Sequence, residues 1–453
     1  MDPKGHWTRK TFRTSEAFKK QTDDKTLFFS ELSSEATRFA EAFNQQFKSA
    51  TKSLEHIAKD WLVLLFSPGK KNCTSVSGFD QEVNSQALNH FLSDSTFDFW
   101  EWQQQIAKQI FKHLSKGRKK QPVSLIIDES SFLKKGNHSC GVIRQYAGTS
   151  GKVDNCQVGV FAALTNGIHH GLVQSKLYLP SDWTKDQKRM EKAHVPEYAQ
   201  NYESKIEMCK EMVFNLRGQG VEFEWVNYDS FYGRDREMMV EFEKEGICFV
   251  ADVPRNTMVY ENINGEAQKV EEWAKTWTFR KITLRQVASG SLQTEAAMKK
   301  VWVKTDNQQH EWMSVWLLIR KDSQGKMHYA LSNYKGNKLI NLAQMHARRY
   351  WIEKSFREAK DSLGMDQYQI RSYPGWHRWM SLIMMAMLFI ISQALIPDPD
   401  CKKLTFEATV KFAMLFLFGN PKLFEKQLFQ WYLDNPHKMK LLEENFNEPN
   451  LTK

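Results

Sequence analysis

The sequence Val-Ser-Leu-Ile-Ile-Asp at residues 123–128 is a compact apolar run that ends on a carboxylate. A short run of this kind is typical of a strand that is buried on both faces. Strand-like and helix-like segments alternate from there to residue 252, which indicates an α/β core. We expect further strands at 156–165, at 223–229 and at 247–252, and one more that ends in the stretch 177–180, with helices at 196–217 and 234–244.

The texture of the chain changes on both sides of this core. Segments that favour β-strands (276–286, 299–305, 312–320 and 327–332) follow it, separated by polar turns. Helical patterns precede the core and resume from Leu339. We therefore divide the chain into a helical N-terminal region (1–115), a first part of the core (120–255), a β-rich insertion (256–338), a second part of the core (339–395) and a helical C-terminal region (396–453).

The chain is basic, with a net charge of +10 and a pI of about 9.0 over 453 residues. This charge favours a polyanionic partner such as nucleic acid, although many basic proteins bind none. Basic patches lie near the N-terminus (Arg9, Lys10, Arg13, Lys19, Lys20) and in the segment 116–122. Each patch suits either a solvated segment or contact with a DNA backbone.

Two classes of protein are disfavoured by composition. The six cysteines are scattered without a C-x2-C pair or an accompanying pair of histidines, so we expect reduced structural thiols and no zinc site. The longest apolar run, 380–395, is interrupted by polar residues and is shorter than the ~20 residues that a bilayer requires. We expect it to form a buried helix, and we expect no signal peptide and no membrane partner.

A second decisive stretch is Arg-Arg-Tyr-Trp-Ile-Glu-Lys-Ser-Phe-Arg-Glu-Ala-Lys at residues 348–360. On a helix with roughly 100° between residues, Arg349, Glu353, Phe356 and Lys360 share one stripe. A carboxylate between two cations on one face suits a site that holds a metal and a polyanion together. Glu358 falls near the opposite face.

Three carboxylates lie on elements that one fold can bring together. Asp128 and Asp229 each end a predicted strand, and Glu353 lies on the helix just described. Carboxylates at the carboxyl ends of buried strands meet at a sheet edge, and convergent carboxylates suit Mg²⁺. A lone aspartate after a strand is more often a turn or cap residue, and we assign Asp252 to that class. Glu129 should face the side opposite Asp128.

Ordered blocks across residues 55–395 resemble the bacterial insertion-sequence transposases with the signature Tyr-x2-Arg-x3-Glu-x6-Lys. Arg349, Glu353 and Lys360 match this signature, whereas His346 stands at the tyrosine position. The other blocks are Asp128–Gly136 with Gly141–Gly148 and Lys152–Val160, Leu177–Pro180, Asp182-Trp183, Val195–Glu197, Tyr228–Gly233, Gly364–Tyr368 with Arg371-Ser372, and upstream Lys70–Asn72 and His90–Ser95.

This resemblance implies an RNase H-like catalytic core interrupted by the β-rich insertion. It implies that Asp128, Asp229 and Glu353 form the catalytic triad and bind Mg²⁺, for which Mn²⁺ can substitute. Arg349 and Lys360 would contact DNA, and we also assign His346 and Tyr232 to DNA binding. The implied activity is cleavage of DNA at transposon ends, followed by joining of the 3′-OH to target DNA through two-metal phosphoryl transfer.

The same resemblance implies double-stranded DNA partners, namely terminal inverted repeats and target DNA. It also implies an N-terminal region that binds DNA, a homodimer in the DNA complex and a cytoplasmic, nucleoid-associated location in bacteria. Some relatives stack a flipped base on an aromatic residue of the insertion. Five tryptophans are candidates for that role, although burial in strands suits each of them better: Trp273, Trp277, Trp302, Trp312 and Trp316.

Two departures from the family pattern leave alternatives open. His346 replaces tyrosine, and Asp128-Glu129-Ser130 stands where the family often has Asp-Asp-Thr. A catalytically inactive, transposase-derived DNA-binding protein is the main alternative, and a nuclease without strand transfer is another. Salt-sensitive DNA binding without metal-dependent cleavage would indicate the inactive protein.

Overall fold

The structure is a computed structural model that describes residues 55–66, 70–72, 85–116, 121–287, 290–306, 311–322 and 324–394, together with Phe406 and Val410. The basic patch at residues 9–20 lies outside the described residues, as does nearly all of the predicted C-terminal region.

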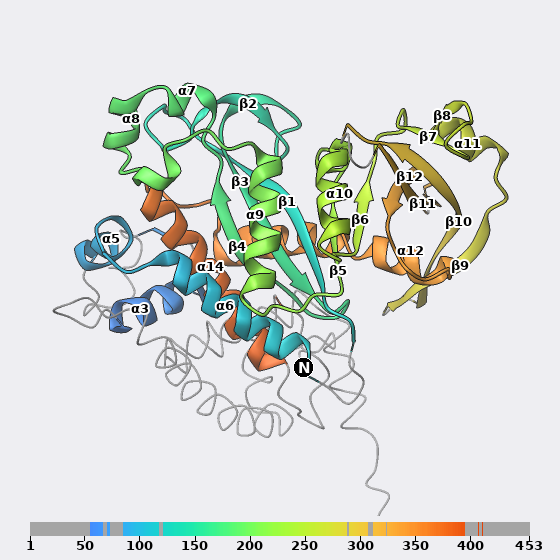
Figure 1. Cartoon of the computed structure of the whole chain (residues 1–453). Helices are drawn as coiled ribbons and strands as arrows, with labels where there is room; N and C mark the ends of the chain where they lie inside the picture. Colours follow the sequence, from blue (N-terminus) through green and yellow to red (C-terminus); the bar gives the residue numbers. More distant parts are fainter. Residues whose placement is uncertain are drawn as a thin grey trace, which may run out of the picture.

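Five strands build the core sheet in the spatial order β4-β3-β1-β5-β6 (Figure 1). Only β3 runs antiparallel to the others, because it pairs antiparallel with both β1 and β4, whereas β1, β5 and β6 pair in parallel. This is the strand order of an RNase H-like core, as expected. The strands are β1 (Ser124–Leu133), β3 (Lys152–Thr165), β4 (His170–Leu177), β5 (Trp225–Tyr228) and β6 (Phe249–Asp252).

One boundary differs from the prediction in a way that matters for the site. Strand β1 continues past Asp128 to Leu133, because residues 128–133 pair with β3. A short strand β2 (Ile143–Ala147) pairs with the first residues of β3. Asp128 therefore lies in the middle of β1 and not at its end. Past Ile127, β1 has no partner on its β5 side, so Asp128 is still placed at an open edge.

Helices cover both faces of the sheet. On one side lies α9 (Lys205–Gly218), followed by α10 (Arg236–Lys244), which connects β5 to β6. On the other side α13 (Tyr350–Leu363) packs against β1, β3 and β4 (Figure 1). The predicted helix at 196–217 starts only at Lys205, where Ser204 and Glu207 form a capping box. Shorter helices α7 (Ser181–Thr184), α8 (Gln187–Lys192) and η1 (Glu197–Ala199) precede it.

The N-terminal helices pack onto the core through a long apolar helix. Helix α14 (Tyr373–Ala394) contacts β4 and the helices α3 (Glu55–Phe66), α5 (Ser85–Ser93) and α6 (Phe99–Leu114). It is long and apolar enough to cross a membrane, but 94% of its most apolar window is buried inside the protein. The run at 380–395 thus belongs to a helix that ends at Ala394, and its side chains from Met380 to Ile391 are buried, as predicted.

The segment between β6 and α12 forms a second, β-rich lobe beside the core (Figure 1). Its last strand pairs antiparallel with β6, with Ala330 opposite Asp252, so that the lobe continues the core sheet. Helix α12 (Leu339–Ala347) packs against β9, β10 and β11. The elements of the lobe are β7 (Met258–Tyr260), β8 (Ala267–Lys269), α11 (Val270–Thr276), β9 (Arg280–Val287), β10 (Gly290–Lys304), β11 (Trp312–Lys321) and β12 (Met327–Ser332).

Candidate active site

Three aspartates stand in one row across the parallel strands. Ile127 of β1 pairs with Tyr228 of β5, and Tyr228 pairs with Ala251 of β6. The next residue on each strand is an aspartate, namely Asp128, Asp229 and Asp252. Neighbouring strands are ≈ 4.8 Å apart, and side chains in register point to the same face. The sheet register therefore brings together the two predicted aspartates and a third.

Arg349 joins this row to α13, the helix that carries the transposase signature and that we call the signature helix. Its Nη1 lies 3.4 Å from Oδ2 of Asp128, its Nε lies 2.9 Å from Oδ2 of Asp252, and its Nη2 lies 2.7 Å from Oε1 of Glu353. Burial alone would lower the pKa of this guanidinium, but the surrounding carboxylates raise the pKa above its ordinary value. Arg349 thus connects two of the three catalytic candidates, Asp128 and Glu353, through one cationic group.

The electrostatics of Asp128 favour a cation. Burial raises its pKa from 3.8 to about 7, and the neighbouring Asp229 adds to this shift, whereas Arg349 opposes it. Burial likewise raises the pKa of Asp229, although backbone N–H groups of Phe231 and Tyr232 donate to its Oδ1 at 2.9 and 3.4 Å. Two carboxylates this close are both ionised more readily when a further positive charge is present.

Asp252 is the residue that sequence reasoning missed. Its Oδ1 accepts a hydrogen bond from Nε2 of His346 at 2.5 Å, and Nδ1 of the same ring accepts one from Nε of Arg320 at 3.2 Å. This pattern makes the imidazole a neutral ring with its proton on Nε2, in agreement with a pKa lowered by burial. Burial would raise the pKa of Asp252, but His346 and Arg349 outweigh it, so the pKa is lowered and Asp252 stays charged.

The predicted stripe of the signature helix faces the sheet. Nζ of Lys360 donates to the carbonyl oxygen of Ser131 at 3.5 Å and to Oγ1 of Thr149 at 3.3 Å. Phe356 packs edge-on against Phe161, with 5.3 Å between ring centroids. Helix α13 ends where Gly364 adopts a left-handed conformation with a φ of 68°.

The two neighbouring glutamates lie on other sides of their elements than Asp128 and Glu353, as predicted. Glu358 lies on another side of α13, where it pairs with His170 at 3.3 Å and with Lys354 at 3.5 Å. Glu129 pairs with Lys205 of α9 at 2.7 Å, on the face of the sheet opposite Asp128. Neither carboxylate pairs with Arg349.

Two residues that we assigned to DNA binding are buried instead. Tyr232 is fully buried in the turn after β5, and His346 is 4% exposed between Asp252 and Arg320. Neither side chain lies at the protein surface in this arrangement, and the assignment of both to DNA binding stays a prediction. Their assignment rested on the motif alone, and the motif does not reveal which of its members face inward.

The tryptophans of the insertion divide by burial. Trp273 and Trp277 are 7% and 8% exposed, so the expectation that they are buried is confirmed for these two. Trp302, Trp312 and Trp316 are half-buried, and the indole N–H of Trp316 donates to the carbonyl oxygen of Tyr334.

Four cysteines of the described residues, Cys140, Cys156, Cys209 and Cys248, are free thiols as expected.

The donor chemistry of the site fits a hard divalent cation. Asp128, Asp229 and Glu353 supply carboxylate oxygens, the ligands that Mg²⁺ prefers. Within the described residues, however, no three His, Cys, Asp or Glu side chains are already arranged around an ion, since Arg349 stands between Asp128 and Glu353. The carboxylates fit a metal in charge and type, and Arg349 serves as their counter-ion.

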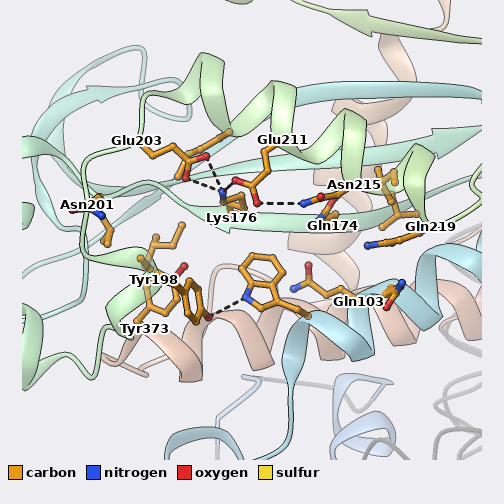
Figure 2. Close-up of a pocket in the computed structure, with 18 of the residues that line it drawn as sticks. Gln103, Gln174, Lys176, Tyr198, Asn201, Glu203, Glu211, Asn215, Gln219 and Tyr373 are labelled. Atoms are coloured by element: carbon orange, nitrogen blue, oxygen red, sulfur yellow. Dashed lines mark hydrogen bonds and ion pairs between the residues drawn. The ribbon is translucent and has the colours of Figure 1, made fainter. Parts of the chain in front are cut away.

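A cavity of about 590 Å³ lies away from these carboxylates, between α6, β4 and α9 (Figure 2). The lysine that lines it, Lys176, is paired with Glu203 at 2.7 Å and with Glu211. Figure 2 shows amide side chains around this trio, among them Gln103, Gln174 and Asn215. Because its lysine is already neutralised, this cavity offers no free cation to a phosphate, and it is not a candidate for the site of phosphoryl transfer.

The chain belongs to the DDE superfamily of endonucleases, whose family model matches residues 43–275, just over half of the chain. A relative from Microchaete diplosiphon, described as a probable transposase for insertion sequence element IS701, is 24% identical over 301 residues. That match covers 64% of this chain and 70% of the relative. The expected kinship with insertion-sequence DDE transposases is thereby confirmed, and the chain is a member of a family of enzymes that act on DNA.

Two solved structures resemble the chain distantly. A piggyBac transposase in a synaptic complex with hairpin DNA matches with a TM-score of 0.38 and 12% identity, over 93% of this chain and 84% of that one. The NurA nuclease from Sulfolobus solfataricus matches with a TM-score of 0.26 and 9% identity, over 61% and 84%. Both scores are below 0.5, so neither likeness carries an argument about function.

Proposed function

We propose that this protein is an active DDE transposase that cleaves DNA at transposon ends and joins the freed 3′-OH to target DNA. The observation that carries the proposal is the meeting of three carboxylates from distant parts of the chain. Asp128 and Asp229 lie in register on neighbouring strands, and Glu353 reaches the same place through Arg349. The family model covers the two aspartates but ends before Glu353.

In this proposal Asp128, Asp229 and Glu353 hold Mg²⁺, with Mn²⁺ as a substitute. Bound metal ions would activate the attacking oxygen and stabilise the leaving one. Arg349 and Lys360, on the same side of α13, would bind phosphates next to the scissile bond, where their fixed positions orient the strand. Two aspartates of the row, Asp128 and Asp229, would thus bind metal together with Glu353 of the helix, whereas Arg349 and Lys360 would bind DNA.

We also propose that two copies act together, each on one of the two terminal inverted repeats, in the cytoplasm of a bacterial cell close to the nucleoid. A single chain has one carboxylate row, whereas an element has two ends to cleave. Mass photometry of the protein with and without repeat DNA measures this: the proposal expects two chains per paired complex.

The experiment that tests catalysis compares Glu353→Gln with Glu358→Gln on a duplex that carries the element's terminal repeat, with Mg²⁺ or EDTA. Both changes remove one carboxylate from the same helix, but only Glu353 faces Arg349. We expect Glu353→Gln to lower cleavage by at least about 10²-fold and to spare DNA binding, because it removes a metal ligand. Glu358→Gln should cleave at close to the wild-type rate.

Other outcomes separate the competing functions. Equal losses in the two variants would contradict the role of the helix face. DNA binding by the wild type without any metal-dependent cut would indicate an inactive DNA-binding descendant. Cleavage without joining of the 3′ end to a target duplex would indicate a nuclease.

A further inference from the structure

Arg349 has three carboxylate partners, each reached by a different nitrogen of its guanidinium. Two of them, Asp128 and Glu353, are metal ligands under the proposed function. When these two turn to a metal ion, Arg349 loses both contacts and is repelled by the incoming charge. The third partner, Asp252 at 2.9 Å from Nε, is the only one of the three without a proposed metal-binding role.

Asp252 is not available to a metal in this arrangement. Its Oδ2 pairs with Arg349 and its Oδ1 accepts from His346, so both oxygens are engaged. Its side chain is only 16% exposed, and the imidazole that holds it is buried and fixed from its other side by Arg320. The carboxylate is therefore committed to Arg349 and His346.

The backbone at Asp252 is fixed as well. Asp252 pairs with Ala330 of β12, and the turn after Asp229 packs directly onto its carbonyl group. A Cβ atom at Gly233 would lie 1.9 Å from the carbonyl oxygen of Asp252, so only glycine allows this approach. The carboxylate thus projects from a rigid support, in contrast to Glu353, which is 48% exposed.

We propose that Asp252 is a positioning residue that retains Arg349 in the active site while Asp128 and Glu353 bind metal. Held through Nε, the guanidinium keeps Nη1 and Nη2 available for a phosphate of the DNA strand. His346 supports this role, because its hydrogen bond to Asp252 fixes the orientation of that carboxylate. It stands at the position where the family signature has tyrosine. The inference rests on the proposed function, since it requires that Asp128 and Glu353 take up a metal.

The structure gives this role a measurable consequence without DNA. In Asp252→Asn, Arg349 loses its charged anchor and relies more on Asp128 and Glu353, so it competes more strongly with a metal. We expect the dissociation constant for Mn²⁺, measured by isothermal titration calorimetry, to rise about five- to tenfold. Arg349→Met removes the competitor, and its dissociation constant should fall below that of the wild type.

The double variant distinguishes positioning from a simple loss of negative charge. If Asp252 acts through Arg349, then Asp252→Asn should change Mn²⁺ affinity by less than about twofold in the Arg349→Met background. An equal loss in both backgrounds would mean a plain charge effect and would overturn the inference. Unchanged affinity in the single Asp252→Asn variant would overturn it too.

A matched control and a reserve variant complete the design. Asp322→Asn removes another aspartate that pairs with a histidine, His328 at 3.1 Å, and it should leave Mn²⁺ affinity unchanged. Should Arg349→Met not fold, Arg349→Lys replaces it, since lysine keeps the charge but lacks the planar guanidinium that reaches three carboxylates through three different nitrogens. In that background the effect of Asp252→Asn should shrink, and an undiminished effect would overturn the inference.

The wild-type titration separates this inference from the function on which it rests. If the wild type binds no Mn²⁺, the proposed metal-dependent function fails, and the inference fails with it. If the wild type binds Mn²⁺ and cleaves DNA while Asp252→Asn matches it in both respects, only the inference is wrong.

Discussion

At the scale of single residues, the negative charge of the Asp128 carboxylate is unfavourable in its buried position. Asp128 is 15% exposed, and its pKa is raised to about 7 by burial and by Asp229. A buried carboxylate with a neighbour of the same charge destabilises the folded protein until a cation arrives. Arg349 offsets only part of this cost, because it is shared among three carboxylates.

Replacing Asp128 should therefore stabilise the metal-free protein. The folded-state pKa is raised above 3.8, so the stability that Asp128 contributes is complete below pH 4 and is lost as pH rises towards 7. We expect Asp128→Asn to gain about 1 kcal/mol over the wild type above pH 7, after the lost contact with Arg349 is allowed for.

Thermal unfolding in EDTA at pH 4, 6 and 8 measures this gain. The melting temperature of Asp128→Asn should exceed that of the wild type by a few degrees at pH 8, and the difference should narrow at pH 4. A constant difference across this range would contradict the assignment of the shift to Asp128. Added Mg²⁺ should raise the melting temperature of the wild type more than that of the variant.

At the scale of elements, the short turn after β5 fixes the spacing between two aspartates. The turn η2 (Tyr232–Arg234) is anchored by the buried ring of Tyr232, and it brings Gly233 against the last residue of β6. Backbone hydrogen bonds from this turn to Asp229 hold that carboxylate in place. One turn thus sets the position of Asp229 relative to Asp252.

A methyl group at Gly233 should disturb both residues. Gly233→Ala forces the turn away from β6, and we expect a loss of about 1–3 kcal/mol in the free energy of unfolding. Cleavage at a temperature where the variant remains folded should fall by more than tenfold, because the aspartates no longer align. Chemical denaturation and a cleavage assay measure the two effects.

Gly218→Ala is the matched control for this change. A Cβ atom at Gly218, the last residue of α9, would meet nothing within 4 Å. Alanine there should be neutral or slightly stabilising, since it favours the helix. Equal losses from the two substitutions would rule out the contact with Asp252 as the cause.

The sequence predicted these elements better than it predicted their contacts. Apolar runs located the strands, and the 3.6-residue period placed Arg349, Glu353 and Lys360 on one side of a helix, as the structure has them. The position of Asp252 beside Arg349 depends on a tertiary contact between residues that are 97 positions apart in the chain, which no local pattern encodes. An aspartate after a strand gives the same local pattern whether it caps a turn or anchors an arginine.

At the scale of the whole molecule, a net charge of +10 predicts DNA binding that weakens as salt rises. Lys360→Met should reduce the slope of log K against log salt by about 1 if Lys360 binds a phosphate as we propose. Lys354→Met removes the same charge from the same helix, but Lys354 pairs with Glu358. Its slope should therefore stay close to that of the wild type.

Fluorescence anisotropy with labelled repeat DNA between 50 and ~300 mM salt provides these slopes. A common slope for wild type and Lys360→Met would remove Lys360 from the DNA interface. A reduced slope in both variants would show that total charge matters and the face of α13 does not.

The pairing of β12 with β6 limits how this molecule can be rearranged. The β-rich lobe enters and leaves the core as an insertion, but its final strand is hydrogen-bonded to the strand that ends in Asp252. A cassette exchange that replaced the whole lobe would leave β6 paired with β5 alone and would expose an unpaired sheet edge next to Asp252. An exchange of this lobe between related proteins should therefore end before Met327, so that the recipient protein keeps its own β12 paired with β6.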